Sequence, residues 1–326
     1  MRHIVTIGGG SGQCRLLTGL RTLPDVRLTA VVSTVDSGGS SGRLRSEREV
    51  PAPGDILKCL VALADDPQGA ALLLQRFRRH PRLQGHNAGN LLLTMLADYT
   101  GRFADGIEAL AEILKVRGTV LPVTTDRATL VAELVDGSRV FGETRIDRPG
   151  RDPRAAIENI FLVPHHGGTV GVFAPAVDAL HRADAVVLGP GDLFTSLIPN
   201  LMVDGIGEAL RGCGATLVFP VNLMTKHGET DGFRARDFVH QLERRMGRQV
   251  DVVLINTRRP DRQFQSESRR HGVDMVGIDR HAAFWQGRRV IETDLLDTTA
   301  AAMRHDPVKL AGAVDAAIGP AAAVQD

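Results

Sequence analysis

Two glycine-rich segments near the start of the chain consist of residue types that bind phosphates. The first, GGGSG at residues 8–12, directly follows the apolar run IVTI at residues 4–7. The second, DSGGSSGR at residues 36–43, directly follows the run AVVSTV at residues 30–35. Glycine lets a backbone N–H approach a phosphate closely, and the start of a helix adds partial positive charge. The two segments therefore predict a phosphate-bearing, nucleotide-like ligand.

The candidate ligand-binding residues of both segments are small, polar or basic. They are Gly8, Gly9, Gly10, Ser11 and Gly12 in the first segment, and Asp36, Gly38, Gly39, Ser40, Ser41 and Arg43 in the second. The guanidinium of Arg43 is suited to holding a phosphate. The first segment lacks the third glycine of the dinucleotide fingerprint and the Gly-Lys-Ser/Thr of a P-loop. We therefore expect no NAD and no P-loop hydrolysis.

Polar residues also follow three later apolar runs, at residues 183–188, 215–221 and 252–255. The candidate contacts there are Gly189, Pro190, Gly191, Asn222 and Thr225, and Asn256 and Thr257 follow the last run. The carboxyl ends of parallel strands share one edge of a sheet, where open α/β sheets bind ligands. The alternative is that these residues only satisfy turns and helix caps.

Asp36 has three interpretations. Its carboxylate could accept hydrogen bonds from ribose hydroxyls, or hold a Mg²⁺ that bridges phosphates, since such metals often bind only one or two carboxylates. The third interpretation is an Asx turn or a helix cap. Asp36 is therefore a catalytic candidate, a ligand-binding candidate and the candidate metal ligand.

His86, Asn87 and Asn90 lie at the start of an apolar helical segment. They either cap that helix or line the site, and His86 is a second catalytic candidate because imidazole can carry a proton near neutral pH. Glu229 could act as a base or as a first-turn helix acid. No Ser-His-Asp or Cys-His arrangement is evident from spacing, and His165 and His166 lack the acidic partners of a metal site.

Composition excludes several classes of protein. The 39 Lys and Arg balance 38 Asp and Glu, which argues against a nucleic-acid binder. The three cysteines have no metal-ligand spacing, so neither structural zinc nor haem attachment is expected. With a strand expected almost at residue 1 and no long apolar run, we predict a cytoplasmic chain without a signal peptide or membrane span. A homodimer is compatible with the sequence, which does not determine the oligomeric state.

Apolar runs alternate with helical patterns through most of the chain, which predicts an α/β fold with a Rossmann-like three-layer parallel sheet. Short β patterns at residues 119–123, 129–135 and 139–144 interrupt this alternation, with Asp136 and Gly137 as a hairpin turn. Residues 145–175 are expected to be connections. We therefore expect a single domain over residues 1–326 that contains an antiparallel β-rich insertion at about residues 117–165.

Taken together, these segments resemble the YvcK-like or gluconeogenesis-factor family, in the superfamily of the 2-phospho-L-lactate transferase CofD. The matching runs span nearly the whole chain: IGGGSG (7–12), GGSSGRLR (38–45), PGDI (53–56), GHNAGNLLL (85–93), GPGDLFTSLIPNLMV (189–203), NLMTKHGETDG (222–232) and RHDPVKL (304–310).

The resemblance implies binding of a nucleotide sugar, notably UDP-N-acetylglucosamine, by a regulator linked to gluconeogenic growth, cell-wall synthesis and cell shape. The alternative that it implies is a Mg²⁺-dependent transferase that moves a phospholactyl group from a guanosine diphosphate donor to a deazaflavin. By the same resemblance, Arg304 matches the arginine that contacts the nucleotide sugar. Three residues depart from the family pattern: Ser37 replaces a second acidic or amide residue, Asp192 a serine, and Ser268 a tyrosine. The third hypothesis is a scaffold protein that binds no ligand.

Overall fold

The computed structural model describes residues 1–35, 41–44, 50–79, 82–148, 154–260, 272–280, 283–299 and 303–319. Within them, seven strands form one sheet in the order β10-β9-β8-β7-β1-β2-β3, and every neighbouring pair is parallel. The strands are β1 (Arg2–Gly8), β2 (Val26–Val32), β3 (Thr119–Pro122), β7 (Ala185–Leu188), β8 (Thr216–Pro220), β9 (Val252–Asn256) and β10 (Arg289–Thr293). The expected parallel sheet is confirmed.

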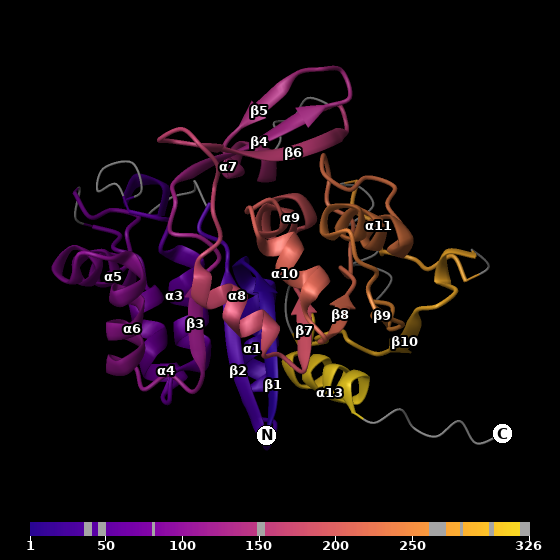
Figure 1. Ribbon diagram of the computed structural model, residues 1–326, viewed down its shortest axis with the longest axis horizontal. Coiled ribbons are helices and arrows are strands. Elements are labelled where there is room, and N and C mark those ends of the chain that lie inside the picture. Colours follow the sequence, from indigo (N-terminus) through magenta and orange to yellow (C-terminus); the bar gives the residue numbers. More distant parts are fainter. Residues whose placement is uncertain are drawn as a thin grey trace.

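Helices cover both faces of this sheet and complete the three layers (Figure 1). One face packs against α1 (Gly10–Leu20), α3 (Gly54–Leu63), α5 (Ala88–Thr100), α6 (Phe103–Ile113) and α13 (Pro307–Ile318). The other face packs against α8 (Ala174–His181), α9 (Ile198–Leu201), α10 (Ile206–Gly212) and α11 (Ala235–Met246). Successive strand residues point to opposite faces, so Ile4 belongs to the first core and Val5 to the second.

Short elements connect these layers: α4 (Pro67–Ala70), the 3₁₀ turns η1 (Ala71–Leu74) and η3 (Ala283–Trp285), and the π-helical turn η2 (Leu193–Leu197). No helix among the described residues has the length and apolar character needed to cross a membrane.

Helix α1 forms because its leucines recur on one face. Leu16, Leu17 and Leu20 are fully buried, and each such burial contributes about 2 kcal/mol. Gln13, which stands where the dinucleotide fingerprint has its third glycine, is also buried, and its Nε2 donates to Thr6 Oγ1 at 3.0 Å and to the Val31 carbonyl at 3.1 Å. This amide joins the start of α1 to both β1 and β2, and so fixes the preceding glycine loop.

A second, antiparallel sheet of three strands has the order β5-β4-β6: β4 (Ala128–Leu134), β5 (Arg139–Phe141) and β6 (Ile157–Pro164). It lies over the carboxyl ends of the parallel strands, with α7 (Glu143–Asp147) on its underside (Figure 1). The structure differs from the expectation in two respects. Strand β3 pairs in parallel with β2 instead of joining the insertion, and β6 occupies part of the segment that was expected to be a connection.

Candidate ligand site

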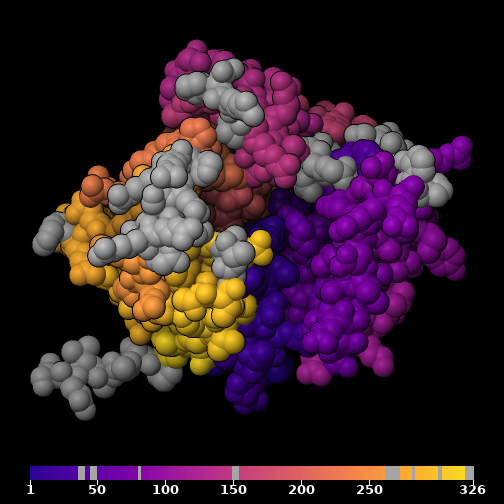
Figure 2. Space-filling model, turned by 180° about the vertical axis from the view of Figure 1, so that it is seen from behind, coloured from indigo at the N-terminus to yellow at the C-terminus, as the bar shows by residue number. Residues whose placement is uncertain are grey.

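The order of the parallel strands indicates where on the sheet a ligand site is expected. From β1 the chain proceeds outward through β2 to β3, and after the insertion it returns beside β1 as β7 and proceeds the other way. The carboxyl ends of β1 and β7 therefore flank the point where strand order reverses, which is where open α/β sheets bind ligands. Figure 2 shows this region from behind as a hollow between the purple and yellow segments, below the magenta sheet.

The loop after β1 leads straight into α1. Gly10 has φ +68°, a left-handed conformation that favours glycine, and its N–H donates to Asp55 Oδ2 at 2.7 Å. The other oxygen of Asp55 accepts from Lys58 Nζ at 2.8 Å. A carboxylate therefore already lies against the start of α1, where a helix favours negative charge.

Gly12 has a packing role besides the phosphate contact that the sequence predicts. A Cβ atom at Gly12 would lie 2.3 Å from the carbonyl oxygen of Pro190, so this glycine lets the loops after β1 and β7 pack backbone to backbone. The loop after β8 joins them, because Asn222 Nδ2 donates to the Gly191 carbonyl at 2.9 Å. The three strand ends thus form one continuous surface.

A pocket of about 260 Å³ opens between these loops, and we call it the switch-point pocket. Its lining comes from the ends of β1, β7 and β8 and from the segment before α13: Gly9, Gly10, Ser11, Gly12, Arg15, Pro190, Gly191, Asp192, Ser196, Asn222, Leu223, Met224, Thr225, Lys226, Met303, Arg304 and His305. The pocket therefore brings together nine of the twenty predicted ligand-binding residues, from four distant segments.

The cations of the switch-point pocket differ in their partners. Arg15 is engaged, since its Nε donates to the His305 carbonyl at 2.6 Å and its guanidinium pairs with Asp297. Arg304 is exposed, and within the described part of the chain its guanidinium has no hydrogen bond or ion pair. Arg304 is thus available to an anionic ligand.

His305 is buried in the same pocket wall with 7% of its surface exposed. Burial lowers the pKa of its imidazole to about 4, although a hydrogen bond to the backbone carbonyl of Val221 partly opposes the shift. The ring is therefore neutral at physiological pH and adds no positive charge to the pocket, whose cation without an acidic partner among the described residues is Arg304.

A second pocket, of about 480 Å³, lies on the other side of Gly10, and we call it the acidic pocket. Four carboxylates and three cations are among its lining residues: Gly10, Ser33, Ser41, Gly54, Asp55, Lys58, Leu74, Arg76, Asn87, Asn90, Glu143, Thr144, Asp147, Arg148, Asp192, Thr195 and Ser196. Gly10, Asp192 and Ser196 line both pockets.

An outer pocket of about 480 Å³ continues from the switch-point pocket toward the ends of β9 and β10. Met224 lines both, and Asn256 and Thr257, which follow β9 as expected, line the outer one. The carboxyl edge of the sheet therefore carries three adjoining pockets.

Of the remaining predicted residues, Ser41, Asn87 and Asn90 line the acidic pocket, and the others that the structure describes lie outside these pockets. Gly8 ends β1 and its carbonyl accepts from Asn200 Nδ2 at 3.2 Å, while Arg43 Nη2 donates to the Gln84 carbonyl at 2.5 Å. Asn87 caps α5, because its Oδ1 accepts from the Asn90 N–H at 2.7 Å. His86 is buried and lines none of these three pockets. Asp36, Gly38, Gly39 and Ser40, as well as Ser37 and Ser268, lie outside the described residues.

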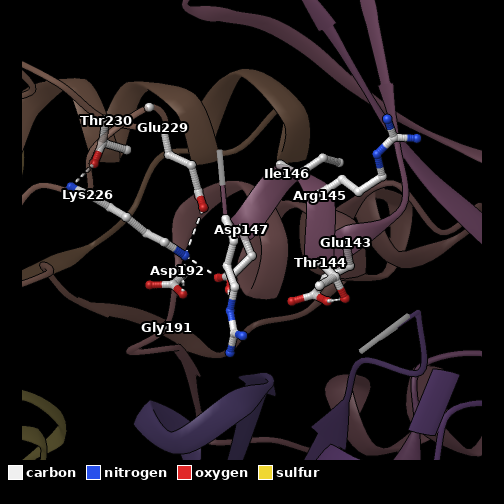
Figure 3. A network of polar contacts seen from close by, with 12 residues as sticks. Glu143, Thr144, Arg145, Ile146, Asp147, Gly191, Asp192, Lys226, Glu229 and Thr230 are labelled. Atoms are coloured by element: carbon white, nitrogen blue, oxygen red, sulfur yellow. Dashed lines mark hydrogen bonds and ion pairs between the residues drawn. The ribbon is translucent and has the colours of Figure 1, made fainter. Parts of the chain in front are cut away.

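Lys226, which the sequence did not single out, is the centre of a charged network (Figure 3). Its Nζ contacts carboxylates from three segments: Asp147 of α7, Asp192 after β7 at 2.7 Å, and Glu229 at 2.8 Å. Burial opposes the charge of Lys226, but Asp192, Glu229 and Asp147 outweigh it and raise the pKa of the ammonium well above its ordinary value.

Glu229 is the buried member of this network, with none of its side chain exposed. Burial raises the pKa of its carboxyl to about 7, with Lys226 opposing the shift and Asp192 adding to it. Since Glu229 lines neither the switch-point pocket nor the acidic pocket, the structure gives it no direct access to a substrate as a base.

The described residues were also compared with the requirements of a metal site. No group of three or more His, Cys, Asp or Glu among them could hold a metal ion. Asp55 is the carboxylate that contacts the start of α1, and both of its oxygens already accept hydrogen bonds, from Gly10 and Lys58. These residues alone do not fit a Mg²⁺ site, and we derive no step through one.

Comparison with known proteins agrees with this fold. The family profile described as 2-phospho-L-lactate transferase CofD matches residues 4–296, so the chain belongs to the CofD family. Within that family it stands with the gluconeogenesis factors, also called YvcK-like proteins.

Three relatives illustrate the similarity. A Thermotoga maritima protein that also carries the gluconeogenesis-factor designation is 38% identical over 317 residues, covering 96% of this chain and 98% of its own. The Bacillus subtilis gluconeogenesis factor is 37% identical over 314 residues, covering 94% and 95%. A crystal structure of a Bacillus halodurans protein superposes with a TM-score of 0.89 at 36% identity, covering 96% and 99%.

Proposed function

We propose that this protein binds a diphosphate-containing nucleotide, in particular a nucleotide sugar such as UDP-N-acetylglucosamine. The observation that carries this proposal is the switch-point pocket, where the start of α1 and the exposed guanidinium of Arg304 line the same cavity. A helix N-terminus and guanidinium groups together suit phosphate oxygens. With about 260 Å³, the pocket accommodates only part of a nucleotide sugar, and the adjoining outer pocket provides room for the rest.

Asp192, one of the departures from the family pattern, is compatible with this proposal. Its carboxylate would repel a phosphate if it were unpaired, but Lys226 pairs with it at 2.7 Å. The pair adds no net charge to the pocket, so the electrostatic preference for an anion is kept.

In the cell, we propose that ligand binding makes the protein a cytoplasmic regulator of gluconeogenic growth and of cell-wall synthesis or cell shape. The relatives named gluconeogenesis factor support this role. Complementation of a deletion strain on a gluconeogenic carbon source tests it. Rescue by the wild type and not by a binding-deficient variant is expected, and equal rescue by both would contradict it.

Binding itself is tested by titration calorimetry. We expect heat of binding for UDP-N-acetylglucosamine and much weaker binding for uridine monophosphate or free N-acetylglucosamine, each of which lacks the diphosphate bridge. A panel of ADP-, GDP- and UDP-sugars determines the base. No binding to any member of the panel would refute the proposal.

The acidic pocket supports a second candidate function, a CofD-like transferase. This pocket meets the switch-point pocket at Gly10, Asp192 and Ser196, so an acceptor bound there would lie beside the phosphates of a donor. In such a reaction the acceptor hydroxyl would attack the phosphorus that bears the lactyl group of a lactyl guanosine diphosphate donor, lose its proton and displace guanosine monophosphate. Mass spectrometry of the protein with this donor, a deazaflavin and Mg²⁺ tests it, and absence of the phospholactyl product would count against it.

A further inference from the structure

Lys226 lies at the boundary between the two inner pockets, and three carboxylates surround its ammonium group. It lines the switch-point pocket, while Asp147 lines the acidic pocket and Asp192 lines both. An ammonium has three donors and no acceptor. Two of these donors are used by Asp147 and Asp192, and Glu229 Oε1 lies 2.8 Å from Nζ as an ion-pair partner. Three carboxylates therefore surround the ammonium, and a phosphate can contact Lys226 only where one of them withdraws.

Glu229 is the carboxylate best suited to release it. Its side chain is fully buried, whereas the side chains of Asp147 and Asp192 are 25% and 43% exposed and can be solvated when ionised. A buried carboxyl is the one that burial favours in the neutral form. Protonation of Glu229 therefore costs less than removing Lys226 from either aspartate.

The local backbone holds Lys226 and Glu229 together. The N–H groups of Glu229 and Thr230 donate to the Lys226 carbonyl at 3.0 and 2.9 Å, and the Lys226 N–H donates to Thr230 Oγ1 at 2.8 Å. The other charged groups near Glu229 are Asp192 after β7, Asp147 on α7 and Arg154, whose Nη2 donates to the Gly228 carbonyl. Because this turn is fixed, a change in the charge of Glu229 acts directly on Lys226.

We propose that Lys226 binds a phosphate of the ligand, and that Glu229 is a positioning residue that frees one Lys226 donor by taking up a proton from solvent as the ligand binds. This inference rests on the proposed function, since it requires an anionic ligand in the switch-point pocket. The proton adds to the Glu229 carboxylate, its ion pair with Lys226 is lost, and the freed N–H points to the phosphate. No other bond is made or broken.

The test is calorimetric titration of UDP-N-acetylglucosamine in buffers of different ionisation enthalpy. The diphosphate of this ligand is a diester that does not titrate near neutral pH, so proton uptake reports on the protein. We expect close to one proton per ligand at about pH 8, and an affinity that weakens up to about tenfold per pH unit above neutrality. Glu229→Gln should abolish the uptake and bind about tenfold more tightly than wild type at about pH 8.

The matched control is Glu208→Gln, which removes the same charge from an exposed position on α10 and should keep the wild-type proton uptake. If Glu229→Gln does not fold, the pH dependence of ligand binding by the wild type still tests the proposal. Binding without proton uptake and with a flat pH profile would overturn this inference alone. No binding of any nucleotide sugar by either protein would overturn the proposed function and this inference with it.

Discussion

The two inner pockets share Gly10, Asp192 and Ser196 but differ in charge. The charged residues that line the switch-point pocket are Arg15, Lys226, Arg304 and Asp192, and of its three cations Arg304 alone lacks an acidic partner among the described residues. The acidic pocket has Asp55, Glu143, Asp147 and Asp192 against Lys58, Arg76 and Arg148. The switch-point pocket therefore favours an anionic ligand and the acidic pocket does not. The two pockets adjoin at the same edge of the sheet and share a few residues, so groups of different charge are favoured side by side.

The largest expected effect comes from removing the exposed guanidinium of the switch-point pocket. Arg304→Ala should weaken binding of UDP-N-acetylglucosamine by roughly 10- to 100-fold, because a hydrogen bond to a charged group contributes about 1.5–3 kcal/mol. The comparison variant is Arg148→Ala, which removes a guanidinium from the acidic pocket. It should change the affinity by less than about twofold, since the Arg148 side chain is 82% exposed. Equal losses in both, measured by calorimetry, would remove the distinction between the pockets.

The second effect concerns the loop contact that builds the switch-point pocket. Gly12→Ala would bring a Cβ atom to 2.3 Å from the Pro190 carbonyl oxygen and should lower the free energy of unfolding by roughly 1–3 kcal/mol. Gly214→Ala is the control, because no atom lies within 4 Å of a Cβ there. Urea denaturation measures both, and an unchanged midpoint for Gly12→Ala would contradict the packed-loop interpretation.

The smallest effect tests whether His305 contributes charge to the switch-point pocket. The pKa of His305 is lowered to about 4 in the folded protein, so between about pH 6.5 and pH 4 the unfolded chain binds more protons. Stability from this residue is therefore lost as the pH falls through that window. His305→Gln should reduce the acid loss by about 1–2 kcal/mol at about pH 5, as measured by denaturant unfolding. Identical pH profiles would show that the imidazole is not held neutral.

The sequence predicted most of the parallel sheet because β1, β2, β7, β8 and β9 correspond to apolar runs that are followed by glycine or polar residues. Strand β3 was predicted to lie in the insertion, because residues 119–123 are followed at once by other β patterns. Its membership of the parallel sheet is evident only from the structure, for example from the pairing of Val31 with Leu121. Strand β6 was missed because its buried positions, Ile157 and Ile160, do not alternate regularly with exposed ones. A regular strand pattern can thus be recognised in the sequence, whereas the strand with which it pairs cannot.

The same limit applies to the candidate site. The residues of the first glycine loop, Pro190, Gly191, Asn222 and Arg304, which line the switch-point pocket, could be selected as candidates because residue type alone suggests their chemistry. The role of Lys226 could not, because its partners Asp147 and Asp192 lie 79 and 34 residues away. Asp55 was missed for a related reason: as part of a PGD segment it indicates a helix start, and its contact with Gly10 spans 45 residues.

The pairing of β1 with β7 has a consequence for folding. Next to this pairing the His3 N–H donates to Asp184 Oδ2, and these two residues are separated by 181 positions. The antiparallel sheet lies between them in the sequence. Contacts of such separation form only after a large loss of chain entropy, so they tend to slow folding. The two loops that meet at Gly12 and Pro190 come together through this pairing. We therefore expect the switch-point pocket to form late in folding, which makes ligand binding a sensitive report on whether the whole chain has reached its native topology.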